Sequence, residues 1–114
     1  MRVIAVWEPM LPTDWTSPSG STLARMGDSR VRQFWDPKHS VSGALNEIVR
    51  RKPLQREPDC CVKDGFHWDQ AILYSPHSKW EDSPSSVFWN GPVAPVSSDL
   101  EKALAQEILK ILSK

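Results

Sequence analysis

The 114 residues of this chain suit a single domain, 1–114, that can bury a core of its own, and two cysteines are too few for a disulfide scaffold. Lys plus Arg and Asp plus Glu number 14 each, so the formal net charge is zero, which argues against a dedicated nucleic-acid-binding protein. No segment approaches the ~18 apolar residues of a membrane span, and the N-terminus does not match a signal peptide. We therefore expect a cytoplasmic protein, or a domain of a longer one.

The N-terminal half of the sequence predicts two strands, each followed by helical structure. Residues 2–7, RVIAVW, form a short apolar run, which is typical of a central strand covered on both faces. We expect at least one short helical turn between residues 13 and 26. Residues 29–37 alternate in the manner of a second strand that stops at a proline. Apolar residues within 38–53 then recur at helical spacing, and another proline closes that helix.

The C-terminal half predicts two more strands and a long helix. Residues 54–68 are expected to be a polar connection, followed by a third strand over 69–75 and a fourth over 86–93 that pair as an antiparallel hairpin. Ser98 and Glu101 have the spacing of a capping box, which marks the start of a helix. Its apolar stripe is typical of a helix packed on a sheet and contains Leu100, Leu104, Ile108, Ile111 and Leu112.

The element order β-α-β-α-β-β-α predicts an α/β fold with parallel pairing through right-handed crossovers. This order resembles the thioredoxin-like fold: VIAVWEPMLPTDW is similar to that family's first strand and active-site loop, and SVFWNGPV with LEKALAQEILKIL to its last strand and terminal helix. The PTDW and FWDP segments also resemble bacterial thioredoxin-like proteins. The resemblance implies a four-stranded mixed sheet flanked by helices.

Two departures from the thioredoxin pattern bear on activity. The EPMLPTDW loop has no cysteine where the redox enzymes of the family carry Cys-x-x-Cys or a single Cys, and FHWDQAIL lacks the proline that the family places before its third strand. The resemblance therefore does not imply oxidoreductase activity. It implies the location of a surface site, at the start of the first helix.

A ligand-binding site is predicted at the carboxyl ends of the first two strands. Asp14 follows the first strand and Asp36 ends the second, and ligands of open α/β sheets bind outside those strand ends. With Trp7, Trp15 and Trp35 near the same edge, aromatic walls and carboxylates would suit a cation or a polar small molecule. In the alternative interpretation, Asp14 caps a helix, Asp36 makes a turn hydrogen bond, and the tryptophans belong to the core.

The adjacent cysteines, Cys60 and Cys61, are the second candidate. Neighbouring cysteines cannot form an ordinary unstrained disulfide, and we expect both thiols to be reduced in a cytoplasm. Two thiolates can bind soft ions such as trivalent arsenic or mercury, and with His67 they would supply three metal ligands. The spacing matches no common structural zinc pattern. Alternatively, one thiol is a small buried hydrophobe and the other is incidental.

No motif for nucleophilic catalysis or phosphate binding is recognisable, since the sequence has neither a G-x-S-x-G elbow nor a glycine-rich phosphate loop. The leading prediction is a non-catalytic domain that binds a small molecule or a protein at the loop after the first strand. We expect no cofactor, no nucleic acid and no membrane, and a homodimer is possible. The alternative prediction is a thiol-based redox or soft-metal-binding protein that uses Cys60 and Cys61.

Overall fold

The structure is a computed structural model that describes residues 1–10, 16–52, 58, 60–82 and 84–113. The chain divides into two compact units, Met1–Ala44 and Leu45–Lys114, and each is described by itself. Among the described residues, no helix has both the length and the apolar character needed to cross a membrane.

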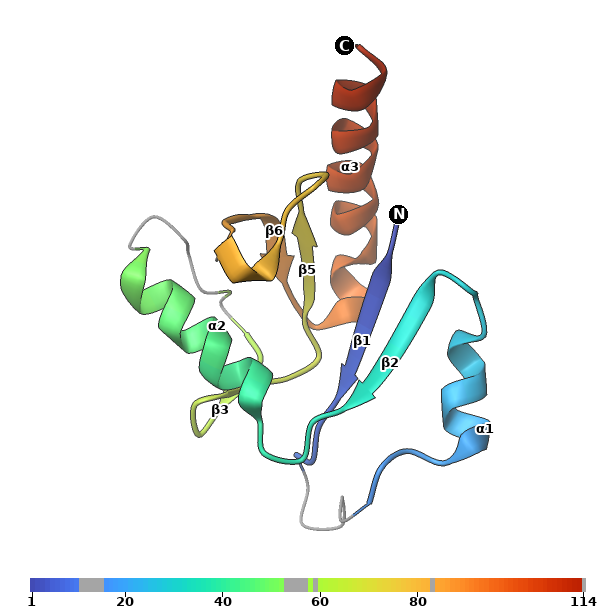
Figure 1. The fold of residues 1–114 in the computed structure, drawn as a ribbon, viewed down its shortest axis with the longest axis vertical. Coiled ribbons are helices and arrows are strands. Elements are labelled where there is room, and N and C mark those ends of the chain that lie inside the picture. The colour runs from blue at the N-terminus through green and yellow to red at the C-terminus, as the bar shows by residue number, and fades with distance from the viewer. Residues whose placement is uncertain (11–15, 53–57, 59, 83, 114) are drawn as a thin grey trace. The chain divides into compact units, whose positions relative to one another are not determined.

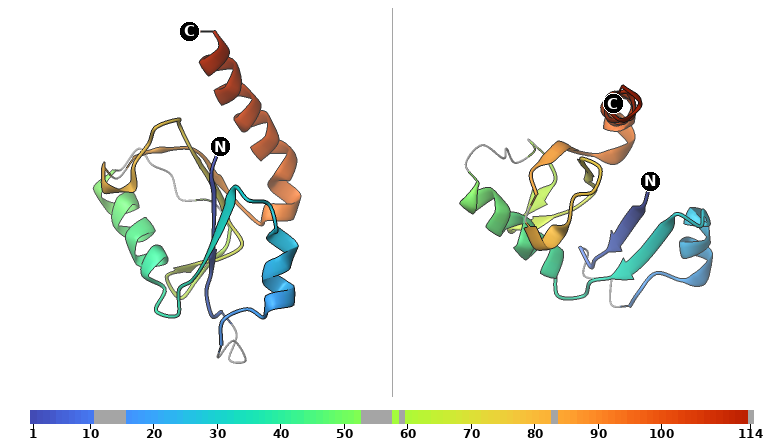
Figure 2. Two further views of the ribbon diagram at one scale, coloured as in Figure 1. Left: turned by 45° about the vertical axis from the view of Figure 1, so that its right-hand side comes forward. Right: turned by 45° about the horizontal axis from the view of Figure 1, so that its top comes forward.

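The first unit is built on a parallel pair of strands, β1 (Val3–Trp7) and β2 (Val31–Trp35), joined in register along their whole length. The connection between them contains α1 (Gly20–Leu23) and the 3-10 turn η1 (Ala24–Met26), which lie beside β2 (Figures 1 and 2). The side-chain amide of Gln33 donates to the Leu23 carbonyl at 2.8 Å and so attaches this turn to the strand. The predicted pairing of the first two strands is confirmed.

Helix α2 (Ser40–Arg51) follows β2 after a short turn. Its apolar face buries Leu45 and Ile48, which fall at the helical spacing expected from the sequence. Basic residues occupy its last turn, where they complement the negative end of the helix dipole.

The second unit contains two antiparallel strand pairs and the C-terminal helix. The short hairpin β3 (Val62–Lys63) and β4 (Phe66–His67) precedes β5 (Ala71–Tyr74) and β6 (Ser86–Asn90), with the 3-10 turn η2 (Trp80–Asp82) between the last two. Helix α3 contacts both β5 and β6. It spans Val93–Leu112, and its last turns extend past the β5–β6 pair (Figures 1 and 2).

The predicted four-stranded mixed sheet is wrong. The described strands form three two-stranded sheets, β1–β2, β3–β4 and β5–β6, so the class is α/β but the thioredoxin-like architecture does not fit. The two long pairings were predictable because each joins strands that are consecutive in the expected order. Nothing in the sequence fixes which strand edges meet beyond those pairs, and the expected polar connection of 54–68 contains a hairpin of its own.

The C-terminal helix begins earlier than the capping box indicates. It starts at Val93, preceded by Pro92, and Ser98 and Glu101 lie inside it. Pro95 is tolerated because an amide N–H in the first helical turn has no intrahelical partner. The predicted apolar stripe is covered only in part, since Leu100 and Leu104 are half-buried whereas the stripe residues nearest the C-terminus are exposed.

Candidate functional site

The predicted ligand site at the strand ends is only partly within the described residues. Trp7 and Trp35 are register partners at the ends of β1 and β2, and both are half-buried. The Trp7 indole donates to the side chain of Gln33 at 2.9 Å. Asp14 and Trp15 lie outside the described residues, so a pocket that includes them stays a prediction.

Asp36 has a structural role that the sequence allowed as an alternative. Its two carboxylate oxygens accept hydrogen bonds from the backbone amides of Ser40 and Val41, each at 2.9 Å. These amides belong to the first turn of α2, which has no intrahelical acceptors for them. The Asp36 carboxylate is therefore used to start α2, with the residue only 9% exposed.

An unpredicted carboxylate cluster adjoins this turn. Glu8 directly follows β1, and its Oε2 lies 3.3 Å from His39 Nδ1 and accepts a hydrogen bond from the Ser42 hydroxyl at 3.4 Å. Burial raises the pKa of the Glu8 carboxyl above 4.5, and the hydrogen bond with His39 opposes that rise. The rule that placed Asp36 at a strand end applies equally to Glu8, so its position in the sequence was an available signal.

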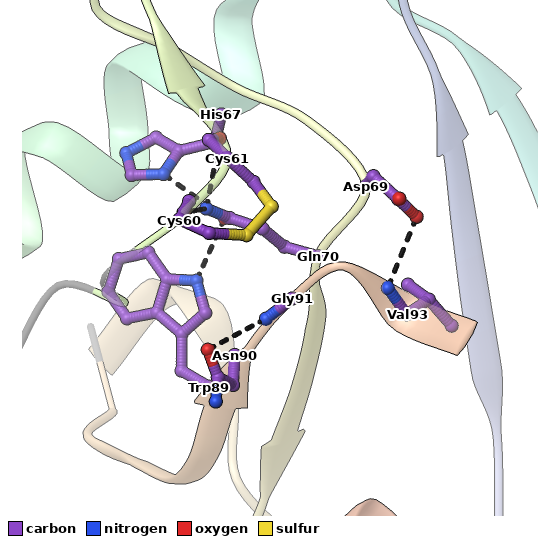
Figure 3. Close-up of a disulfide and its surroundings, with 9 residues drawn as sticks. All are labelled: Cys60, Cys61, His67, Asp69, Gln70, Trp89, Asn90, Gly91 and Val93. Carbon is purple, nitrogen blue, oxygen red and sulfur yellow. Dashed lines mark hydrogen bonds between the residues drawn. A yellow bond between two sulfur atoms is a disulfide. The ribbon is translucent and has the colours of Figure 1, made fainter. Parts of the chain in front are cut away.

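The adjacent cysteines form a disulfide, Cys60–Cys61 (Figure 3). The expectation of two reduced thiols is therefore wrong for this structure. Adjacent residues can close an eight-membered ring when the backbone adapts, and Cys61 has a φ of 74°, a region that non-glycine residues seldom occupy. Both cysteines are half-buried, so a reagent in solution has partial access to them.

Gln70 holds the backbone of this ring. Its side-chain Nε2 donates to the carbonyls of both Cys60 and Cys61, each at 3.1 Å (Figure 3). Its Oε1 accepts the indole N–H of Trp89, on β6, at 2.9 Å. One amide side chain thus connects the disulfide ring to a strand that follows it by almost thirty positions, a contact that no local sequence pattern reveals.

His67 also takes part in these hydrogen bonds, and it is buried, with 5% of the residue exposed. Its Nδ1 lies 3.1 Å from Gln70 Oε1, and its Nε2 lies 2.7 Å from Oδ1 of Asn46 on α2. The imidazole is also stacked at a tilt on the Trp89 ring, with 5.3 Å between the ring centroids. We refer to Cys60, Cys61, His67, Gln70 and Trp89 as the disulfide network.

The predicted metal site of Cys60, Cys61 and His67 is not assembled. The two sulfurs are bonded to each other, and both imidazole nitrogens of His67 face amide oxygens. Within the part of the chain that the structure describes, no three His, Cys, Asp or Glu residues are grouped to hold a metal ion.

The disulfide also abuts the turn between β6 and α3. A Cβ placed on Gly91 would meet the Asp69 carbonyl oxygen and would lie 3.0 Å from Cys61 Sγ, so only glycine fits there without displacement. Beside it, the Asp69 carboxylate accepts from the Val93 amide at the start of α3 (Figure 3). A change in the geometry of the disulfide ring would therefore alter the contacts of this turn.

Comparisons of the chain with family models, with curated proteins and with solved structures found no match. The resemblance to thioredoxin-like proteins accordingly stays a prediction. The chemistry offered by the described residues is that of a partly accessible disulfide, set in a network of amide, indole and imidazole hydrogen bonds.

Proposed function

We propose that this chain is a thiol–disulfide redox switch, in which Cys60 and Cys61 interconvert between the vicinal disulfide and a dithiol. A thiolate of a dithiol reductant attacks one sulfur, the S–S bond breaks, and a mixed disulfide forms. The second thiol of the reductant then displaces the cysteine and closes the reductant's own disulfide. The protein gains two electrons and two protons, and the reductant loses them.

The observation that carries this proposal is a half-buried disulfide whose ring is held by specific hydrogen bonds from Gln70. A ring that contains only two residues closes almost no chain, so it contributes little through loop entropy. The disulfide instead affects only the structure around the two cysteines. If the chain is cytoplasmic, as its sequence predicts, a disulfide there belongs to the class that acts transiently in catalysis or redox sensing.

Reduction would change the geometry at three defined contacts. Once the ring opens, Cys61 can leave its left-handed backbone conformation, and its carbonyl would then move from both Gln70 and the Trp68 amide, which now donates to it at 2.9 Å. The contact of Cys61 Sγ with Gly91 would change as well. The redox signal would therefore reach the turn that begins α3.

The test combines thiol counting with amide NMR on the full chain. After treatment with dithiothreitol, we expect alkylation to label two thiols, and the amide signals of Trp68 and Gly91 and the indole signal of Trp89 to shift. Amides of β1 and β2, which lie in the other unit, serve as an internal control. The double variant Cys60→Ser/Cys61→Ser is the matched control and should not respond to the reductant. A pair that resists reduction, or thiols that form with no shift at these signals, would refute the switch.

Two earlier predictions remain beside this proposal. Soft-metal binding would use the same two thiols after reduction. Binding of a small molecule or protein at the loop after the first strand stays a prediction because residues 11–15 lie outside the described residues. A homodimer also stays a prediction.

A further inference from the structure

The orientation of the Gln70 amide is fixed by groups that have a single hydrogen-bonding role. An indole N–H can only donate, so the atom facing Trp89 must be the oxygen, Oε1. The carbonyls of Cys60 and Cys61 can only accept, so the atom facing them must be the nitrogen, Nε2. Three independent contacts thus agree that Gln70 presents an acceptor to His67 Nδ1.

The Asn46 amide is fixed in the same way. Its Nδ2 donates to the Gly65 carbonyl at 2.8 Å, which leaves Oδ1 as the atom that faces His67 Nε2. Both imidazole nitrogens of His67 therefore point at acceptors. Neutral imidazole has one N–H, whereas imidazolium has two, so only the charged form satisfies both hydrogen bonds.

The described partners of the His67 ring are uncharged groups that are suited to a cation. Asn46 comes from α2, Gln70 from the loop before β5, and Trp89 from β6, and the Trp89 ring lies within the range of a cation–π interaction. The hairpin that contains His67 carries the charged residues Lys63 and Asp64. The loop before β5 carries Asp69, whose carboxylate accepts from the Val93 amide. On α2, Glu47 pairs with Arg50 and Arg51.

On the basis of the redox function proposed above, we propose that His67 is a buried imidazolium whose proton is coupled, through Gln70, to the redox state of Cys60 and Cys61. In the disulfide form, the eight-membered ring places the carbonyls of Cys60 and Cys61 against Gln70 Nε2. Gln70 Oε1 therefore faces His67. When reduction releases the Cys61 carbonyl, the Gln70 amide can turn, and His67 loses the acceptor that stabilises its charge.

The coupling has a defined sign. Exchange with a dithiol reductant transfers two hydrogens and leaves the number of free protons unchanged. In the pH range where His67 is charged in the disulfide form but neutral in the dithiol form, reduction additionally releases one proton to solvent. Acid therefore favours the disulfide, and the equilibrium constant for reduction rises up to about tenfold per pH unit within that range.

The first measurement follows the imidazole Hε1 signals of the full chain through a pH titration. We expect the midpoint of the His67 signal to lie higher in the disulfide form than in the reduced chain, by on the order of one pH unit, as loss of a charge-assisted hydrogen bond implies. The variant Cys60→Ser/Cys61→Ser should resemble the reduced chain. His67→Gln assigns the signal. Equal His67 midpoints in the two redox forms would overturn the coupling.

The second measurement is the redox equilibrium with dithiothreitol between about pH 5.5 and about pH 8, the range in which histidine titrates. We expect the wild-type constant to increase with pH, His67→Gln to abolish the increase, and the exposed-site control His77→Gln to retain it. A wild-type pair that is reduced with a constant independent of pH would overturn the coupling and leave the switch intact. A pair that is not reduced at any pH would refute the switch itself, whereas the Hε1 comparison with the serine variant would still decide the coupling.

Discussion

At the scale of single residues, the first unit contains a carboxyl group under opposing influences. Removal of Glu8 from water raises its pKa, and the neighbouring Asp36 charge acts in the same direction, whereas His39 and Ser42 stabilise the ionised form. The balance leaves the pKa raised, with the side chain 11% exposed. Glu8 therefore holds its proton more tightly in the folded chain than in the unfolded one.

This raised pKa predicts how stability depends on pH. Between the ordinary value of 4.5 and the folded value, the native state binds more protons than the unfolded state, so the contribution of Glu8 to stability falls as pH rises through that window. We expect the thermal midpoint of the wild type, measured relative to Glu8→Gln, to fall across this window and then to level. The exposed Glu101→Gln variant is the control. A difference that is constant or that increases with pH would contradict the prediction.

At the scale of elements, α2 shows how local sequence sets helix stability. Asp36 satisfies amides of its first turn, and near its end Glu47 pairs with both Arg50 and Arg51. Gly43 lies in the body of the helix, and a Cβ placed on it would meet nothing within 4 Å. The backbone entropy of this glycine destabilises the helix, and no close contact at its Cβ position requires a residue without a side chain.

Gly43→Ala should therefore raise the free energy of unfolding by about 0.5–1 kcal/mol, measured by urea denaturation. Gly65 gives the matched contrast. It also has open space around its Cβ position, but its φ of 82° is unfavourable for alanine, so Gly65→Ala should destabilise the chain. Equal effects of the two substitutions would show that backbone conformation does not govern these sites.

The elements that the sequence predicted are those with strong local signals. The parallel partnership of β1 and β2 follows from a crossover connection, and the β5–β6 hairpin follows from two strands separated by a turn. The start of α3 was misplaced because a good capping box at Ser98 lies within a helix that a proline-containing first turn begins.

The disulfide network was predictable only in part. Cys60, Cys61 and His67 stand close together in the sequence and were singled out for their chemistry. Gln70 and Trp89 were not, because their role depends on the packing of β6 against the loop before β5, and a glutamine has no distinctive sequence signal. The sequence likewise gave no reason to prefer a disulfide over two thiols.

At the scale of the whole molecule, the disulfide cannot act as a cross-link that strongly stabilises the fold. It lies within one of the two units and links neighbouring residues, so it restricts almost none of the unfolded chain. In the chain-entropy view, such a ring contributes about 1 kcal/mol, against about 3 kcal/mol for a loop of 15 residues.

Replacement of both cysteines, Cys60→Ser/Cys61→Ser, should consequently lower the free energy of unfolding by only about 1 kcal/mol. Guanidinium denaturation of the oxidised wild type, the reduced wild type and the variant would measure this change. The reduced wild type and the variant should have the same free energy of unfolding. A loss of several kcal/mol, or unfolding on reduction alone, would mean that the pair is a structural element.

The adjacency of the two cysteines also decides how the oxidation state can be followed outside the folded chain. Cleavage after Arg56 and Lys63 leaves both sulfurs on one short peptide, EPDCCVK, with no cross-link to any other fragment. The oxidised peptide is lighter than the reduced one by the mass of two hydrogens. If free thiols are blocked by alkylation before a digest without reductant, the masses of this peptide would therefore report the state of the pair in the cell from which the protein came.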